Sequence, residues 1–240
     1  MPPALTAHQP VLPEYNGYMT SHSAPHPLPD ATPTATGGSP LVRAVQALER
    51  SAAVDPVAAL LARTSAPVTR SGAVRALLQG KGVGHAIHPA LTDVPIGLWV
   101  STVFLDLVGG ESSRAAAQRL LGAGLLSAVP TAATGFAEWH DTANPERRVG
   151  AAHAAVNSVA LGLLGASYAA RARGRHRLGV LTALAGLSVA SASAYLGGHL
   201  ATTRKVGTRD AAFDRDGVGP ALSRPATAAT PETGWPPVPD

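Results

Sequence analysis

The chain has 240 residues, of which only 14% are charged, whereas about 25% are charged in an average soluble domain. It contains no cysteine, which excludes disulfides, thiolate metal sites, cysteine nucleophiles and an iron–sulfur cluster held by this chain. The net charge of +4 comes almost entirely from arginine, and the arginines flank apolar stretches instead of forming one patch. We therefore expect a membrane protein whose partner is the lipid bilayer, with no nucleic-acid partner.

Both ends of the chain lack the apolar periodicity of a folded segment. Residues 1–40 are rich in proline, and residues 206–240 contain glycines followed by prolines. Segments of this composition bury too little apolar surface to offset the entropy of ordering, so both are predicted to be disordered tails. The first tail has no basic start followed by an apolar core, which argues against a signal peptide. Met19 is an alternative to Met1 as the first residue.

Residues 41–80, between the first tail and the apolar part of the chain, have apolar positions at helical spacing. Pro56 interrupts this pattern, because proline lacks the amide hydrogen that a helix interior needs. The sequence therefore predicts short amphipathic helices on either side of Pro56, and a further one that ends at Gly80. Amphipathic helices beside membrane spans favour a position on the membrane surface.

Residues 81–205 contain four windows that are almost free of charge. A membrane span needs about 20 mainly apolar residues, and small residues inside the windows permit close helix packing in lipid. The predicted fold class is all-α, an integral membrane four-helix bundle that crosses the cell membrane four times. The predicted spans are residues 91–108, 119–137, 149–170 and 178–200.

Histidines collect on one side of this predicted membrane domain. We call side A the side on which the first span begins, and side B the opposite side; the short connections make neighbouring spans antiparallel. Imidazoles that come from separate helices at one depth are what a haem iron or a divalent metal requires. We favour His153 and His199 as ligands because both lie inside apolar spans. The candidate cofactor ligands on side A are His85, His88, His153 and His199.

Other polar residues on side A are candidates for supporting roles. Asn157 follows His153 by four residues and so lies on the same helix face. Asp93 is placed either to orient a histidine or to accept backbone hydrogen bonds at the start of the first span. Trp139 and Asp141 follow the second span on the same side. A histidine near a span end also caps helices or contacts headgroups without binding anything, so a purely structural role for this cluster stays open.

Charged residues near side B predict an ion pair. Asp106 lies near the end of the first span, and Arg114 and Arg119 lie at the start of the second. An ion pair between Asp106 and either arginine would tether the two spans as a hairpin. We interpret these three residues as structural.

The spans carry distinctive strings: GVGHAIHPALTDVPIGLWVSTVFLDLVGG (82–110), VPTAATGFAEWHDT (129–142), RRVGAAHAAVNSVAL (147–161) and AYLGGHL (194–200). Together they resemble an uncharacterised bacterial membrane family, the domain-of-unknown-function family numbered 2231. The resemblance covers about residues 80–205 and implies a four-span membrane domain without an established molecular function. Some members of that family carry a Rieske ferredoxin domain behind the spans. Because this chain has no cysteine, an iron–sulfur centre of that kind would have to lie on another polypeptide.

No enzyme motif is present in the sequence, so we lean against an enzyme. The favoured specific function is a redox-associated module with a histidine-lined haem or metal site on side A, which exchanges electrons with a separate redox protein. The alternative is a structural or assembly membrane protein with no cofactor. Passage of an ion or metal is less favoured, because side B offers no matching polar relay inside the spans. Arginines on both sides leave the orientation in the membrane open.

Overall fold

The computed structural model describes residues 39–211, so the predicted tails lie outside the described part except for residues 206–211. These last residues are held against the bundle and so differ from the predicted tail. The amide of Ala86 donates to the carbonyl of Thr208 (2.8 Å), and the amide of Asp210 donates to the carbonyl of Gly84 (2.9 Å). We call residues 206–210 the strap.

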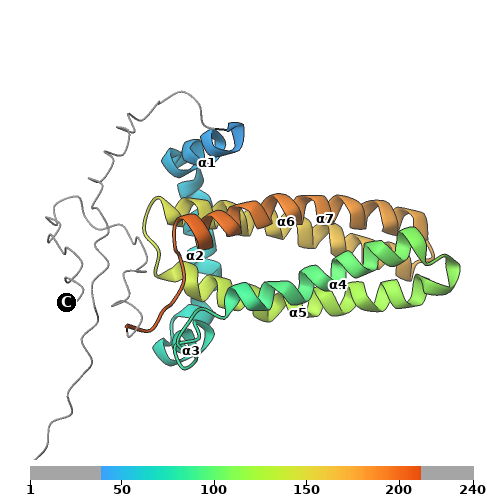
Figure 1. Ribbon diagram of the computed structural model, residues 1–240, viewed down its shortest axis with the longest axis horizontal. Helices are drawn as coiled ribbons and strands as arrows, with labels where there is room; N and C mark the ends of the chain where they lie inside the picture. The colour runs from blue at the N-terminus through green and yellow to red at the C-terminus, as the bar shows by residue number, and fades with distance from the viewer. Residues whose placement is uncertain (1–38, 212–240) are drawn as a thin grey trace, which may run out of the picture. The chain divides into compact units, whose positions relative to one another are not determined.

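Four long helices run side by side in the described part of the chain (Figure 1). All four are long and apolar enough to cross a membrane, which confirms the predicted all-α four-helix membrane bundle. The first three each contain one of the predicted spans, and the fourth predicted span extends from the last helix into the turn that follows it. The four helices are α4 (His88–Val108), α5 (Arg114–His140), α6 (Glu146–Ala172) and α7 (His176–Gly198), with α7 continued by a π-helical turn (His199–Thr203).

The four helices form two hairpins, α4–α5 and α6–α7, whose helices pack closely within each hairpin and contact the other hairpin much less. Glycine permits the close approach, as small residues do in membrane bundles. A Cβ on Gly124 would lie 2.4 Å from Nε1 of Trp99, and a Cβ on Gly186 would lie 2.9 Å from Cγ of Leu164. The large side chain of one helix therefore fills the space above a glycine of its neighbour.

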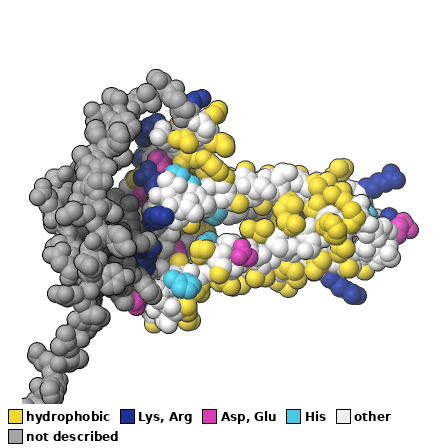
Figure 2. Space-filling model, in the orientation of Figure 1, with side chains coloured by type: hydrophobic (Ala, Val, Ile, Leu, Met, Phe, Trp, Pro, Cys, Tyr) yellow, Lys and Arg dark blue, Asp and Glu magenta, His cyan; other side chains and the backbone are white. Residues whose placement is uncertain are grey.

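The outer surface of the bundle is apolar between its two ends. Figure 2 shows hydrophobic side chains along the length of the helices and lysines or arginines towards both ends. Leu126 and Phe104 are 76% and 61% exposed. A surface on which large apolar side chains are this exposed suits lipid rather than water.

The three helices before the bundle are α1 (Pro40–Arg50), α2 (Asp55–Thr69) and α3 (Gly72–Leu78), and a 3₁₀ turn (Ala52–Val54) separates the first two. Helix α2 lies across the side A end of the bundle and packs on α5 and α6 (Figure 1). Ala58 packs there with Trp139 and Ala151. Asp55 accepts two hydrogen bonds from Arg148 at 2.7 and 2.9 Å, which fixes the start of α2 to α6.

Helix α1 is fixed to the end of α7 by a buried carboxylate. Glu49 accepts hydrogen bonds from Nε of Arg204 and from Nε2 of His199, both at 2.8 Å. Burial raises the pKa of the Glu49 carboxyl, but the hydrogen bonds and charges of Arg204 and His199 outweigh burial and hold this pKa below its ordinary value of 4.5. The ionised carboxylate is therefore the form that the folded protein stabilises.

We expect acid to release α1 from the bundle. Since the folded-state pKa of Glu49 is depressed, its contribution to stability is present above about pH 4.5 and is lost as the pH falls through the lowered pKa. Glu49→Gln should release α1 at neutral pH. A fluorophore on a cysteine placed at Leu41, in a chain with no native cysteine, reports this as increased mobility. Gln46→Ala, an exposed change on the same helix, should leave the signal unchanged; equal effects would contradict this role of Glu49.

Candidate functional site

A cavity of about 160 Å³ opens at the side A end of the bundle, and residues of all four long helices and of the strap line it. Its walls are mainly apolar and include Phe136 and Leu161. In a cavity with mainly apolar walls, the few polar groups can meet a ligand with little competition from water. The polar side chains that line it include His88, Glu138, Glu146, His153 and Asn157.

His88, at the start of α4, is oriented by α5. Its Nδ1 lies 2.9 Å from the carbonyl oxygen of Thr131 and 3.2 Å from Oγ1 of Thr134. A carbonyl oxygen only accepts, so Nδ1 carries the proton and Nε2 keeps its lone pair. The ring lies over Gly135, where a Cβ would be only 2.7 Å from Cε1 of His88. Two features of α5, a carbonyl and a glycine, thus fix the orientation of this imidazole.

His153 is oriented by α7 in the same way. Its Nδ1 lies 2.8 Å from the carbonyl oxygen of Ser193, and its ring lies over Gly197, where a Cβ would be 2.9 Å from Cε1. The Nδ2 group of Asn157 donates to Nε2 of His153 at 3.1 Å, which agrees with a proton on Nδ1 and a lone pair on Nε2. Asn157 thus lies on the same helix face as His153, as its spacing predicts, and is hydrogen-bonded to it.

The structure brings together His88 and His153 but not the predicted set of four histidines. His85 is exposed, and its Nδ1 lies 3.0 Å from the carbonyl of the next residue. His199, which the sequence pairs with His153, lies instead against Glu49 of α1. The reason is that α1 docks on the turn after α7 and supplies a carboxylate, a contact 150 residues away in the chain.

The other predicted supporting residues lie at different places. Trp139 lines the cavity and donates from Nε1 to the carbonyl of Arg147 at 2.9 Å. Asp141 is exposed and accepts a hydrogen bond from Gln79 at 2.6 Å, so it fixes the end of α3 to the end of α5. Asp93 is exposed on α4 and is not among the residues that line the cavity.

Glu138 is a cavity residue that the sequence reasoning did not select. It is 9% exposed, and its Oε2 accepts hydrogen bonds from the amide (2.9 Å) and hydroxyl (3.0 Å) of Thr208 in the strap. Its Oε1 has no hydrogen-bond partner within residues 39–211. The available signal was its position directly after a charge-free span. Its contact with the strap could not be predicted, because the composition of residues 206–240 indicates a disordered tail.

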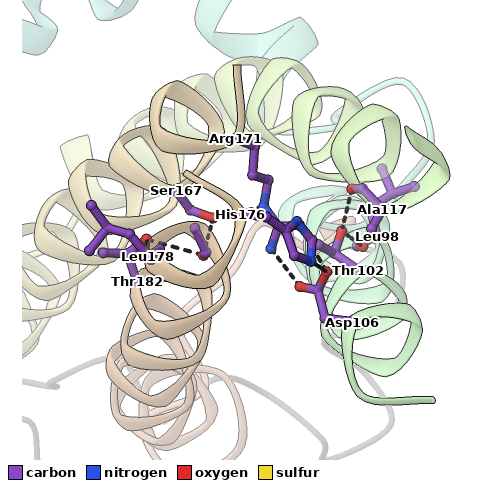
Figure 3. Close-up of polar contacts among 10 residues, drawn as sticks. Leu98, Thr102, Asp106, Ala117, Ser167, Arg171, His176, Leu178 and Thr182 are labelled. Carbon is purple, nitrogen blue, oxygen red and sulfur yellow. Dashed lines mark hydrogen bonds and ion pairs between the residues drawn. The ribbon is translucent and has the colours of Figure 1, made fainter. Parts of the chain in front are cut away.

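Asp106 forms an ion pair with Arg171 of α6, which corrects the predicted pairing with Arg114 or Arg119. Figure 3 shows the guanidinium facing the carboxylate across the space between the hairpins; NH1 of Arg171 lies 2.8 Å from Oδ1 of Asp106. The two side chains are only 2% and 1% exposed. Arg114 pairs with Glu111 at 2.7 Å, since Glu111 lies three residues before it, in the 3₁₀ turn (Glu111–Ser113) that precedes α5. We call the Asp106–Arg171 pair the clasp.

Glycine at position 135 is expected to be necessary for the position of His88. Gly135→Ala should destabilise the protein by about 1–3 kcal/mol, because the added methyl group forces the ring to move. Gly162→Ala is the matched control, because a Cβ at that position in α6 meets nothing within 4 Å. Thermal unfolding in detergent measures both. If Gly135→Ala is as stable as the control, the ring is not held against this glycine.

The fold and the site define a four-helix membrane bundle with two oriented imidazoles at one end. Residues 84–210 match the model of a family described as predicted membrane protein, DUF2231. The chain belongs to this family and is a membrane protein embedded in the lipid bilayer. No curated protein matches the chain, and no solved structure does.

Proposed function

We propose that the bundle binds a haem between His88 and His153 and serves as a redox module of the cell membrane, exchanging electrons with a separate protein. One observation carries this proposal. Two imidazoles from different hairpins line one cavity, and each is bound through Nδ1 to a backbone carbonyl of the neighbouring helix. This arrangement leaves Nε2 as the ligand atom, and such a bond on the other nitrogen orients and strengthens a metal-binding histidine.

The number of donors favours haem over a divalent metal ion. A protein site for a divalent ion normally needs at least three side-chain ligands. Within residues 39–211, no three or more histidine, cysteine, aspartate or glutamate side chains are placed to hold a metal ion. A haem brings four nitrogen ligands of its own, so two imidazoles complete the coordination of its iron.

The strap makes room for a ligand of this size. A haem is larger than the cavity of about 160 Å³, so we expect it to displace the strap residues Val206 and Gly207, which line the cavity. The hydrogen bonds between Thr208 and Glu138 would open for this. The limited contact between the hairpins lets this end of the bundle adjust.

Each part of the site has a defined task in this proposal. The haem supplies one-electron redox chemistry when bound. The carbonyls of Thr131 and Ser193 hold the imidazoles in the tautomer that offers Nε2, and the apolar walls exclude water. Asn157 gives up its hydrogen bond to Nε2 of His153 on binding. The loss of this hydrogen bond lowers the affinity for haem somewhat, since the bond from Nε2 to the iron replaces it.

Titration of the purified protein with hemin tests the proposal. We expect saturable binding of one haem per chain and the absorption bands of a haem with two imidazole ligands. The double variant His88→Ala/His153→Ala should lose these bands. The matched double variant His85→Ala/His199→Ala should keep them. Absence of saturable binding, or equal spectra for both double variants, would contradict the proposal and support a structural protein without a cofactor.

A further inference from the structure

The contact that orients the first histidine occurs a second time in the bundle, at constant spacing. His88 of α4 binds the carbonyl of Thr131 in α5, and His153 of α6 binds the carbonyl of Ser193 in α7. The two histidines are 65 residues apart, and the two carbonyl residues are 62 apart. Both spacings recur in other contacts of the bundle.

The core contacts repeat with the same spacings. Trp99 of α4 lies over Gly124 of α5, and Leu164 of α6 lies over Gly186 of α7. The large residues are again 65 apart and the glycines 62 apart. The difference of three residues falls in the side B connections, where α5 begins later after α4 than α7 does after α6. A shorter connection changes the loop and leaves the helix contacts in register.

Two hydroxyl groups near side B repeat in the same way. Thr102 donates to the carbonyl of Ala117 at 3.3 Å, and Ser167 donates to the carbonyl of Gly179 at 2.5 Å; Figure 3 shows the groups on either side of the clasp. These pairs are also 65 and 62 residues apart. Three kinds of contact, from one end of the bundle to the other, therefore follow one repeat.

We propose that the two hairpins are copies of one structural unit packed about an internal two-fold axis, and that the clasp makes unlike copies pair. Asp106 and Arg171 are 65 residues apart, so they occupy the same position in the two units, and they meet each other. Two copies of the α4–α5 hairpin would bring two buried carboxylates together. Two copies of the α6–α7 hairpin would bring two buried guanidinium groups together. Since uncompensated charge is costly inside a membrane, each hairpin selects a partner of opposite charge.

Gly179 lies beside the clasp. It explains how equivalent positions of the two units can hold an arginine (Arg171) and the much smaller Asp106. A Cβ on Gly179 would lie 2.6 Å from Cγ of Arg171, so an arginine needs glycine at this place in the second helix of its hairpin. The equivalent residue in the first hairpin is Ala117, which leaves enough room for the shorter Asp106. The unit with the large basic residue therefore has glycine at the facing position, and the unit with the smaller acidic residue has alanine there.

The hydroxyl group beside the clasp is present in both units. Ser167 accepts a hydrogen bond from Nε of Arg171 at 3.2 Å, one helical turn before the arginine. Thr102 lies one turn before Asp106 and offers an equivalent hydroxyl. An arginine at position 106 would therefore find the same local acceptor, provided that the opposing residue in α5 were a glycine.

This inference does not depend on a bound ligand. If the proposed haem is bound, the same axis would relate its two ligands, His88 and His153. The clasp lies at the other end of this axis and keeps the two hairpins in register. Its residues touch neither histidine, so they are positioning residues.

Exchange of the two charges tests the inference. Asp106→Arg alone should reduce the yield of monodisperse protein in detergent by about tenfold or more, because two arginines then meet without a carboxylate. Asp106→Arg/Arg171→Asp should recover only part of it, since Ala117 obstructs the new arginine. Adding Ala117→Gly to the exchange should bring the yield and the melting temperature close to those of the wild type.

Two controls make the result specific. Ala117→Gly in the wild-type background should bring no gain, because Asp106 does not need the space. Asp106→Arg/Arg119→Asp should remain as poor as Asp106→Arg, because Arg119 is exposed and is not the partner. A triple variant that is no better than the double exchange would overturn the inference. All readouts are yield and stability, so a failure of haem binding leaves the outcome unaffected.

Discussion

Removing the arginine of the clasp is expected to destabilise the bundle by about 3–5 kcal/mol. The buried carboxylate of Asp106 then loses its guanidinium partner and keeps only the imidazole of His176, 4.0 Å away. Arg171→Leu is the appropriate variant, since leucine fills part of the volume without adding a polar group. The two side chains are almost completely buried, so water does not replace the lost partner. Thermal unfolding in detergent, followed by circular dichroism, measures the loss.

The double variant Asp106→Leu/Arg171→Leu should recover most of this loss, because neither charge then remains inside the membrane. Replacement of a whole buried ion pair by apolar residues is often neutral or stabilising. Arg119→Leu is the matched surface control and should change stability by less than about 0.5 kcal/mol. A double variant as unstable as the two single changes combined would show that the two charges do not act as a pair.

Loss of a single histidine is expected to change the haem rather than remove it. If the proposed haem is bound, His88→Ala or His153→Ala would leave its iron with one imidazole from the protein and a position open to an added ligand. We expect the affinity for hemin to fall by at least about tenfold and the reduced protein to take up carbon monoxide, which the wild type with two imidazoles resists. A carbon monoxide difference spectrum measures this change.

His199→Ala provides the control for this experiment. Its imidazole lies against Glu49 and not in the cavity, so the variant should show the wild-type spectrum and no uptake of carbon monoxide. The change should appear only in the docking of α1. If His88→Ala and His153→Ala differ from each other as strongly as one of them differs from the wild type, the two residues are not equivalent ligands.

The lack of charge over long stretches was sufficient to predict the spans, because hydrocarbon excludes unpaired charge whatever the tertiary structure. The acidic and basic residues at the ends of these stretches gave the predicted boundaries of the spans. The position of Asn157 beside His153 followed from helical periodicity alone, since residues four apart share a face. These features depend on composition and on local geometry, both of which the sequence contains.

Pairing between helices did not follow from the sequence. Asp106 was expected to pair with Arg114 or Arg119 because they are close in the chain, yet the partner is Arg171 on a different hairpin. The depth of a histidine can be inferred from its distance to a span end, but the direction of its ring cannot. His153 faces the cavity shared with His88, whereas His199 is held by a carboxylate from α1.

The sequence by itself determined that this chain is an all-α membrane protein, that it contains no cysteine for a thiolate site, and that the histidines of residues 81–205 lie mainly at one end. Tertiary structure alone decided which imidazoles share a cavity and which charges meet. The physical reason is that membrane insertion depends on the summed hydropathy of each segment. Contacts between segments depend instead on the rotation of each helix about its axis, which glycines such as Gly135 and Gly197 set through close packing.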